Sequence, residues 1–418
     1  MNKRQIKSFW QELPKPFFAL APMANVTDFA FREMIAKYGK PNVMWTEFVS
    51  ADGLMSSGRD RLLIDLKFSK KQKPIVAQLF GSNPEKMREA VRLVCELGFD
   101  GVDINMGCPD RSVEKGGGGA SMMKDPKRAI EIIYAARSGW VSSSDTSCSE
   151  PNRWGAPSSA RRSGLVSPPD TFTPRANRTP LVRLAPRSVG GADQTQSVTN
   201  NVPISVKTRL GYNKIDMDWI RLLLEQRLPA LTVHLRTRKE MSEVGAHWDM
   251  MPEIVKLRDK MSPETLIIGN GDVVSVEDGI VKAKQYGCDG IMIGRGIFGK
   301  PWLFEDLQDL GRPRRRRRQV SNEAKPNVRH FVAPRRGRPS YINSSKSPKE
   351  RLKIMLEHAK LFEKTFKGMK NFDTMKKHFK AYVSGWDGAK ELRIKLMGAN
   401  DYDETKKIVI NYLLSNSE

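Results

Sequence analysis

PIVAQLFGSNPEKMREAVRLVCELGFDGVDINMG, residues 74–107, is the stretch of this sequence that decides its fold. It opens with a short apolar run (74–80), continues through a segment with apolar residues at helical spacing (84–98), and ends in a second apolar run (101–107). Two runs of strand length joined by a helix are typical of a parallel strand–helix–strand unit. Because both runs are continuously apolar in their first half, we expect strands that are covered on both faces.

Apolar runs of the same length recur on both sides of this unit, with helical or loop segments such as 276–287 between several of them. The other runs are 17–23, 42–48, 203–210, 230–236, 266–272 and 290–296. Strands that alternate with helices in this way predict an α/β fold, a (β/α)8 TIM barrel. Polar residues and glycines lie at the carboxyl ends of the runs, which is the face that carries the chemistry of such barrels.

Two segments interrupt this pattern. Residues 138–200 are rich in Ser and Pro and hold seven arginines, no lysine and four acidic residues. Residues 311–346 hold ten arginines, two lysines and one glutamate. We predict that both are disordered insertions, because neither shows the sustained periodicity of a packed element. RNA-binding arms are the alternative, and for 311–346, where the charge is concentrated, the two interpretations are equally favoured.

The remaining chain divides into a barrel and a helical domain. Residues 1–137 and 201–310 together hold 247 residues, against roughly 250 in a typical barrel of this kind. From about 347 the pattern becomes helical, so 347–418 predicts a bundle of helices. Ser347 and Asp401 are the expected starts of two of them.

The charge of the chain favours a polyanionic partner. The sequence has 418 residues and a formal net charge of +24, which suits nucleic acid, with a solvated basic surface as the alternative. In the predicted helical domain, Lys376, Lys377 and His378 lie close together and suit a phosphate backbone.

The cysteines and the apolar stretches bear on the location of the protein and argue against a zinc-stabilised protein and a membrane protein. Cys95, Cys108, Cys148 and Cys288 form no CxxC pair, which indicates a reducing compartment and argues against a structural zinc site. No apolar stretch approaches the roughly 18 residues of a membrane span, and the N-terminal stretch is better explained as a first strand than as a signal peptide. We therefore expect a cytoplasmic protein without a structural metal, and a monomer by default.

The most specific local signal is DINMGCPDRSVEKGGGGASMMKDP, residues 103–126. Cys108 follows the end of a predicted strand and stands between Gly107 and Pro109, so we expect its thiol at the active face. The glycine run 116–119 permits close backbone approach to a planar ligand or an RNA strand, although such a run also suits a flexible loop.

A second group of residues predicts an anion site. GNGD (269–272) and IGRG (293–296) place glycine-rich turns after the last two strands, where these barrels commonly bind phosphate, and Arg295 would hold the dianion. Barrel enzymes that act on sugar phosphates share such turns. The other residues at this face must therefore distinguish a flavin from a sugar phosphate.

Three rim residues favour a flavin. Lys207, His234 and Gln78 end or lie in three predicted strands and can hydrogen-bond the edge of a flavin ring. A cation beside that edge stabilises the anionic reduced flavin. For His234 alone, a structural role is an equal alternative.

Taken in order, these motifs resemble those of the tRNA-dihydrouridine synthases. The motifs are APMANVTD (21–28), TEFVSADGL (46–54), QLFGSNP (78–84), INMGCP (104–109) with GGGGA (116–120), VKTRLGY (206–212), LTVHLRT (231–237), NGDV (270–273) and IGRG (293–296). KKHFKAYVSGWDGAKELRIKLM (376–397) resembles the helical RNA-binding domain of that family. The resemblance covers nearly all of 14–137, 202–308 and 347–400, and the two insertions are the main departures from it.

The resemblance implies an oxidoreductase that acts on a CH–CH bond, with bound FMN, NADPH as reductant and uridines in the elbow region of tRNA as substrate. It implies that Cys108 is the proton donor and that Asn105 and Arg209 contact uracil. The residues that it places around FMN are Pro22, Met23, Ala24, Gln78, Lys207, His234, Asn270, Gly271, Asp272, Gly294 and Arg295. Two alternatives stay open: an FMN barrel that reduces a free pyrimidine or an enone, and a tRNA-binding relative whose insertions have impaired catalysis.

Overall fold

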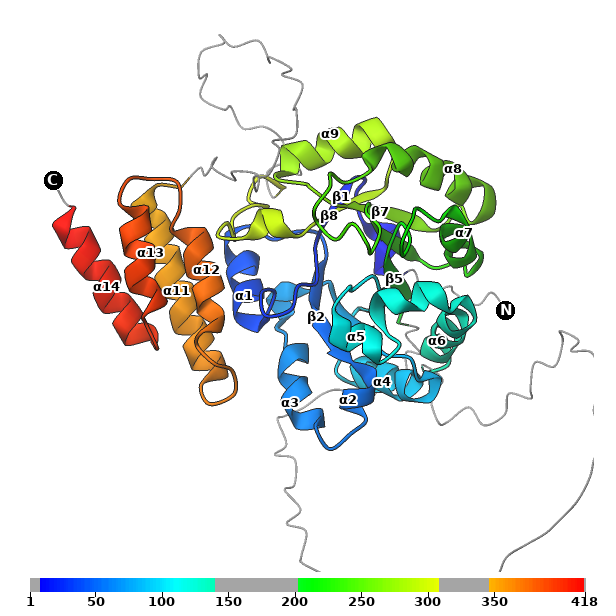
Figure 1. Ribbon diagram of the computed structural model, residues 1–418, viewed down its shortest axis with the longest axis horizontal. Helices are drawn as coiled ribbons and strands as arrows, with labels where there is room; N and C mark the ends of the chain where they lie inside the picture. Colours follow the sequence, from blue (N-terminus) through cyan, green and yellow to red (C-terminus); the bar gives the residue numbers. More distant parts are fainter. Residues whose placement is uncertain (1–7, 140–201, 308–345, 417–418) are drawn as a thin grey trace, which may run out of the picture. The chain divides into compact units, whose positions relative to one another are not determined.

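The computed structural model describes residues 8–139, 202–307 and 346–416. Its centre is a parallel eight-stranded sheet in the order β1-β8-β7-β6-β5-β4-β3-β2, with helices outside it (Figure 1). The strands are β1 (Phe17–Leu20), β2 (Met44–Ser50), β3 (Ile75–Phe80), β4 (Gly101–Met106), β5 (Ile204–Arg209), β6 (Ala230–His234), β7 (Leu266–Asn270) and β8 (Gly290–Ile293). Every one of them begins or lies within a predicted apolar run.

Backbone hydrogen bonds close the sheet on itself. Leu20 N donates to Val43 O at 3.1 Å, and Val43 N donates to Phe18 O at 3.2 Å, so β1 is joined to the chain just before β2. The predicted (β/α)8 TIM-barrel fold is confirmed. The interior is filled with buried side chains such as Trp45, Ile268 and Met292, as expected for a packed barrel rather than a pore.

The strand register places the predicted site residues side by side. Asn105 on β4 pairs with Lys207 on β5, and Arg209 at the end of β5 pairs with His234 on β6. His234 in turn pairs with Asn270 on β7. Polar residues that are far apart in the sequence therefore meet at one edge of the barrel.

The connecting helices begin and end at the signals that the sequence carries. The helix α4 starts after Asn83, whose side chain accepts a hydrogen bond from Lys86 N, and it has Pro84 in its first turn. The α-helices of the barrel are α1 (Phe29–Tyr38), α2 (Ala51–Leu54), α3 (Arg59–Leu63), α4 (Pro84–Glu96), α5 (Arg111–Lys115), α6 (Pro126–Ser138), α7 (Met217–Glu225), α8 (Met251–Met261) and α9 (Val276–Tyr286). Short 3-10 helices are η1 (Phe9–Glu12), η2 (Ile64–Leu66), η3 (Lys70–Gln72), η4 (Gly119–Lys124), η5 (Trp248–Met250) and η6 (Arg295–Ile297).

The C-terminal part is helical, as predicted. Its helices are α11 (Pro348–Phe366), α12 (Thr374–Tyr382), α13 (Ala389–Met397) and α14 (Tyr402–Ser415). Ser347 and Glu350 form a capping box at the start of α11, and the Asp401 side chain caps α14. The helix α11 packs against α12 and α14, and also against α1 of the barrel.

The predicted insertions, 138–200 and 311–346, lie outside the described residues except at their ends. Within the described part of the chain, no helix combines the length and the apolar character that crossing a membrane requires.

Candidate active site

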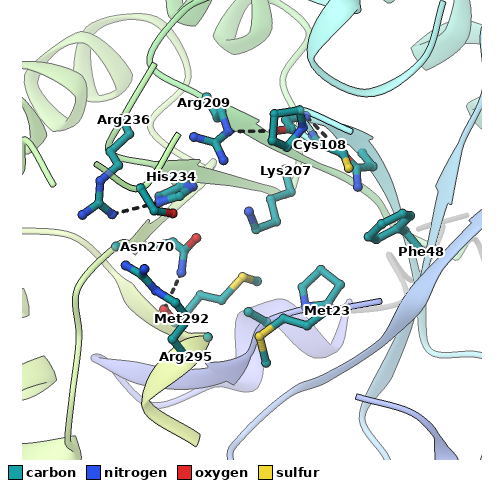
Figure 2. Close-up of a pocket in the computed structure, with 18 of the residues that line it drawn as sticks. Met23, Phe48, Cys108, Lys207, Arg209, His234, Arg236, Asn270, Met292 and Arg295 are labelled. Carbon is teal, nitrogen blue, oxygen red and sulfur yellow. Dashed lines mark hydrogen bonds between the residues drawn. The ribbon is translucent and has the colours of Figure 1, made fainter. Parts of the chain in front are cut away.

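A cavity opens where the strands end (Figure 2). It encloses about 940 Å³ of space that is free of protein atoms and continuous with solvent. The predicted site residues that line it are Pro22, Met23, Gln78, Asn105, Cys108, Lys207, Arg209, His234, Asn270, Gly271, Asp272, Gly294 and Arg295. Ala24 does not line it and is exposed.

The cavity wall includes the Cys108 thiol, and the loop that carries it is held from two sides. The backbone N–H groups of Gly107 and Cys108 donate to Asn105 Oδ1 at 3.0 and 2.9 Å. On the other side, Arg209 Nε donates to the Gly107 carbonyl at 2.8 Å. Burial is the main cause that raises the pKa of the Cys108 thiol, so the thiol keeps its proton at neutral pH and can act as an acid.

The glycine run next to Cys108 does not reach the cavity. Gly119 has a φ of 61°, and a Cβ atom there would lie 2.7 Å from the carbonyl oxygen of Cys108. A Cβ atom at Gly117 would lie 2.9 Å from Ser82 Cβ. The run permits close packing against the Cys108 loop and the β3–α4 loop.

Lys207 brings a positive charge to the cavity. Its side chain points into the middle of the cavity (Figure 2) and makes no hydrogen bond or ion pair with any residue in the described ranges. Burial, followed by the charge of Arg209, lowers the pKa of Lys207 to about 8. A cation in this position favours an anionic ligand.

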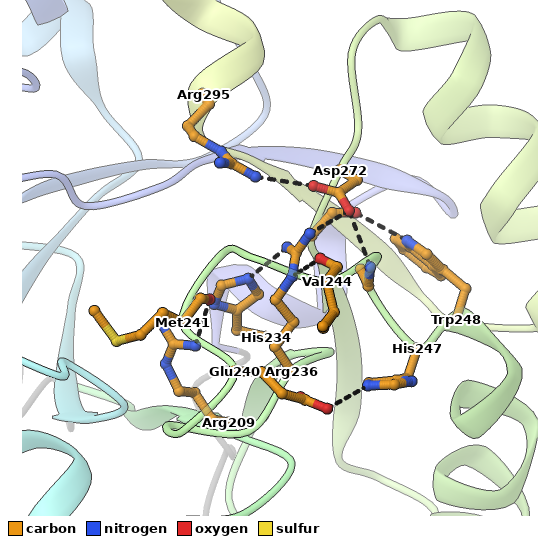
Figure 3. Close-up of polar contacts among 12 residues, drawn as sticks. Arg209, His234, Arg236, Glu240, Met241, Val244, His247, Trp248, Asp272 and Arg295 are labelled. Carbon is orange, nitrogen blue, oxygen red and sulfur yellow. Dashed lines mark hydrogen bonds and ion pairs between the residues drawn. The ribbon is translucent and has the colours of Figure 1, made fainter. Parts of the chain in front are cut away.

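Two arginines in the cavity wall share one carboxylate (Figure 3). Arg236 and Arg295 both form ion pairs with Asp272, the second at 2.9 Å. Arg236 Nη1 also lies 3.3 Å from His234 Nε2. Two guanidinium groups on one carboxylate leave a net positive charge, which again suits an anion.

Arg236 is a site residue that the sequence analysis missed. It is 2% exposed and lines the cavity together with Phe48, Ser242 and Met292, which were also missed. The available signal was an arginine two positions beyond a strand end, in the stretch LTVHLRT.

Burial lowers the pKa of His234 well below its usual value, and Lys207, Arg209, Arg236 and Arg295 lower it further. The imidazole is therefore neutral at physiological pH. A neutral ring can donate or accept a hydrogen bond toward a ligand without adding charge.

Comparison with known proteins bears on the family. The model of the dihydrouridine synthase family (Dus) matches residues 19–140 and 192–417. The chain belongs to the dihydrouridine synthase family. It is 33% identical over 410 residues to "Probable tRNA-dihydrouridine synthase 2" of Bacillus subtilis (strain 168), covering 97% of each chain. A "Probable tRNA-dihydrouridine synthase" of Staphylococcus epidermidis is 33% identical over 407 residues, covering 96% of this chain and 95% of that one.

Among solved structures, histamine dehydrogenase from Rhizobium sp. 4-9 is 12% identical and aligns with 70% of this chain and 45% of its own, with a TM-score of 0.40. That likeness is too low to support any inference about this dihydrouridine synthase family member.

The predicted tRNA contacts in the helical part of this family member divide into two kinds. Lys377 is exposed, and Lys376 is half-buried and forms an ion pair with Asp373. The prediction for His378 is wrong: its side chain is 0% exposed and packs against Phe31 and His358, with ring centroids 4.6 Å from each. His378 lies on the inner face of α12, so it cannot reach a phosphate at the surface.

Within 8–139, 202–307 and 346–416, no group of three or more His, Cys, Asp and Glu side chains is placed to hold a metal ion.

Proposed function

We propose that this protein reduces the C5–C6 double bond of uridines in tRNA, with FMN bound in the barrel cavity and NADPH as reductant. The observation that carries the proposal is the presence, in one cavity, of the Cys108 thiol, whose pKa burial raises, and the Lys207 ammonium, which has no ion-pair partner among the described residues. The first is an acid, and the second is a binding site for a negative group. The names of the relatives from Bacillus and Staphylococcus support tRNA as the substrate.

The residues around the cavity fit FMN. Two cations, Arg236 and Arg295, form ion pairs with the single carboxylate of Asp272, which leaves a net positive charge. This charge lies next to the glycine-rich ends of β7 and β8, where a phosphate would bind. Gln78, Lys207 and His234 would hold the ring and the ribityl chain, with Pro22 and Met23 along the ring. Asn270, Gly271 and Gly294 would complete the phosphate site. When bound, FMN supplies a hydride to C6 of the uracil.

The chain's own residues supply the proton and manage the charge. The Cys108 Sγ–H bond breaks as its proton moves to C5 of the uracil, which leaves a thiolate. Lys207 and Arg209 both interact favourably with that thiolate, and solvent returns the proton. Arg209 and Asn105 lie in the cavity wall beside Cys108, where they would contact the uracil.

We assign catalysis to the barrel, 1–137 with 201–310, and tRNA contact to the helical domain, 347–418. A uridine in folded tRNA has to leave its stack to enter the cavity, at a cost of a few kcal/mol. Contacts of Lys376 and Lys377 with phosphates would offset this cost.

The test is mass spectrometry of nuclease fragments from unmodified tRNA after incubation with the protein, FMN and NADPH. We expect a gain of about two mass units on a uridine, since a hydride and a proton are added. The Cys108→Ala variant should lose most of this gain while still binding FMN. Absence of any gain from folded, flavin-loaded protein, or efficient reduction of free pyrimidines without tRNA, would contradict the proposal.

A further inference from the structure

The reactive loop depends on a residue that does not line the cavity. Resting on the proposed function, we propose that Asp103 is a positioning residue: it fixes the orientation of the Gln78 and Asn105 side-chain amides, and through them the Cys108 loop. Asp103 opens the stretch 103–126 but was given no role there; it lies on β4, does not line the cavity and is fully buried.

A continuous chain of hydrogen bonds connects Asp103 to Cys108. Gln78 Nε2 donates to Asp103 Oδ2 at 2.6 Å. Asn105 Nδ2 donates to Gln78 Oε1 at 3.0 Å. Asn105 Oδ1 then accepts the backbone N–H groups of Gly107 and Cys108. Ser205 Oγ donates to the other carboxylate oxygen, Asp103 Oδ1, at 2.6 Å.

This hydrogen-bond relay runs from Asp103 through Gln78 and Asn105 to the backbone of the Cys108 loop. Its Asp103 end sets the orientation of both side-chain amides. An amide side chain can turn over and exchange its donor and acceptor, whereas an ionised carboxylate only accepts. Because Asp103 accepts, Gln78 must present its NH2 group to Asp103 and its oxygen to Asn105. Asn105 must then present its own oxygen to the loop, which is the only orientation that satisfies two N–H groups of the backbone.

The backbone carbonyls of Gly107 and Cys108 are satisfied without the relay. Arg209 holds the Gly107 carbonyl, and Ala120 N donates to the Cys108 carbonyl at 2.9 Å. The relay therefore supplies the acceptor that these contacts do not. Gln78 is fully buried and Asn105 is 7% exposed, so water has little access to replace it.

The chemistry of Asp103 supports a role beyond packing. It forms no salt bridge with any residue in the described part of the chain, and burial raises its pKa to about 6. A buried carboxylate without an ion pair is costly, and the charge of Lys207 only partly offsets this cost. Its value lies in being an acceptor that cannot turn over.

The test compares Asp103→Leu with Asp103→Asn in full-length protein without FMN or tRNA. Leucine removes the acceptor, whereas asparagine can keep an oxygen toward Gln78 and turn its NH2 group toward the Ser205 hydroxyl, which can accept. Two measurements report on the loop: amide hydrogen exchange of Gly107 and Cys108, and the pH profile of Cys108 alkylation by iodoacetamide, followed by peptide mass spectrometry.

We expect Asp103→Leu to speed exchange of the two amides by about tenfold or more and to change the alkylation profile of Cys108. Asp103→Asn should behave like the natural protein. Ser205→Ala is the matched control, because it removes the other hydrogen bond of Asp103 and leaves the relay intact. If folded Asp103→Leu shows the same amide exchange and the same Cys108 alkylation profile as the natural protein, the proposal is overturned.

If Asp103→Leu does not fold, Gln78→Met breaks the relay at its centre and must give the same faster exchange. Unchanged exchange in that variant would equally overturn the proposal. Neither measurement uses FMN, NADPH or tRNA. A protein that reduced no tRNA would therefore contradict the proposed function and leave the result on Asp103 standing.

Discussion

Arg236 Nη1 lies 3.3 Å from His234 Nε2, and this contact fixes the tautomer of the histidine. A guanidinium group carries N–H donors and no acceptor, so Nε2 has to accept and the ring proton has to reside on Nδ1. His234 is thus held as a neutral ring with its proton on Nδ1. The same guanidinium forms an ion pair with Asp272, which connects the tautomer to the anion side of the cavity.

This relationship predicts the NMR behaviour of His234. In ¹⁵N-histidine-labelled protein, we expect the Nδ1–H tautomer to persist from pH 8 to pH 5, because burial and four neighbouring cations lower the pKa of the ring. Arg236→Met should release Nε2 and allow the other tautomer. Arg295→Met is the control, since Arg295 shares Asp272 but has no hydrogen bond to His234. An Nε2–H tautomer in the natural protein would refute the assignment.

Lys207 predicts a pH dependence of flavin binding. Only the protonated amine attracts an anionic ligand, and burial lowers the pKa of Lys207 to about 8. The affinity of the cofactor-free protein for FMN should therefore fall as the pH rises through about 8. Lys207→Met should bind FMN about tenfold or more weakly at pH 7 and lose this dependence.

Quenching of flavin fluorescence measures this affinity. Lys124→Met is a suitable control, because Lys124 is exposed, stands over the Tyr212 ring and does not line the cavity. A Lys207→Met protein that keeps both the affinity and the pH dependence would show that the ammonium does not bind the cofactor.

The fold was accessible from the sequence because parallel strands covered on both faces leave continuous apolar runs, and each run ends in polar residues at the active edge. The same logic located Lys207, His234 and Cys108. Arg236 ends the predicted run 230–236, but only His234 of that run was assigned to the site. Ser242 escaped because the loop after β6 has no periodicity, and Met292 escaped because a methionine within an apolar strand looks like core. Ala24 was included on a motif match alone, and it does not line the cavity.

His378 shows a different limit of sequence reasoning. It stands among lysines and was grouped with them, although its spacing of three residues from Met375 and four from Tyr382 puts it on the apolar face of α12. The structure places it on the buried side, where neither ring nitrogen has a hydrogen-bond partner among the described residues.

This burial predicts how His378 affects stability at low pH. Burial, then the charge of Lys377, lowers the pKa of His378 to about 3. The unfolded chain takes up a proton below its ordinary pKa of about 6.5 and the folded chain does not, so stability falls as the pH drops from about 6.5 toward 3. For this one group the loss between pH 7.5 and pH 5 is on the order of 2 kcal/mol.

Urea unfolding of the natural protein and of His378→Phe tests this. Asp28, whose pKa burial raises to about 7, acts in the opposite direction, so the difference between the two proteins is the quantity to follow. We expect the free energy of unfolding of His378→Phe to increase relative to that of the natural protein as the pH falls. Parallel curves would mean that His378 is not buried as a neutral ring.

Lys377 and His378 are adjacent in the sequence, so they separate a contact with tRNA from a structural role. Lys377 is exposed on α12, and under the proposed function it neutralises a phosphate of tRNA. Each such contact releases counterions, so Lys377→Ala should lower the slope of log affinity against log salt by about 1 and weaken binding of different tRNAs alike. His378→Phe should leave this slope unchanged, because the side chain does not reach the surface. Filter-binding titrations across a range of salt concentrations measure both. A slope that responds to His378→Phe and not to Lys377→Ala would show that α12 meets tRNA with a different face, or that it does not meet tRNA at all.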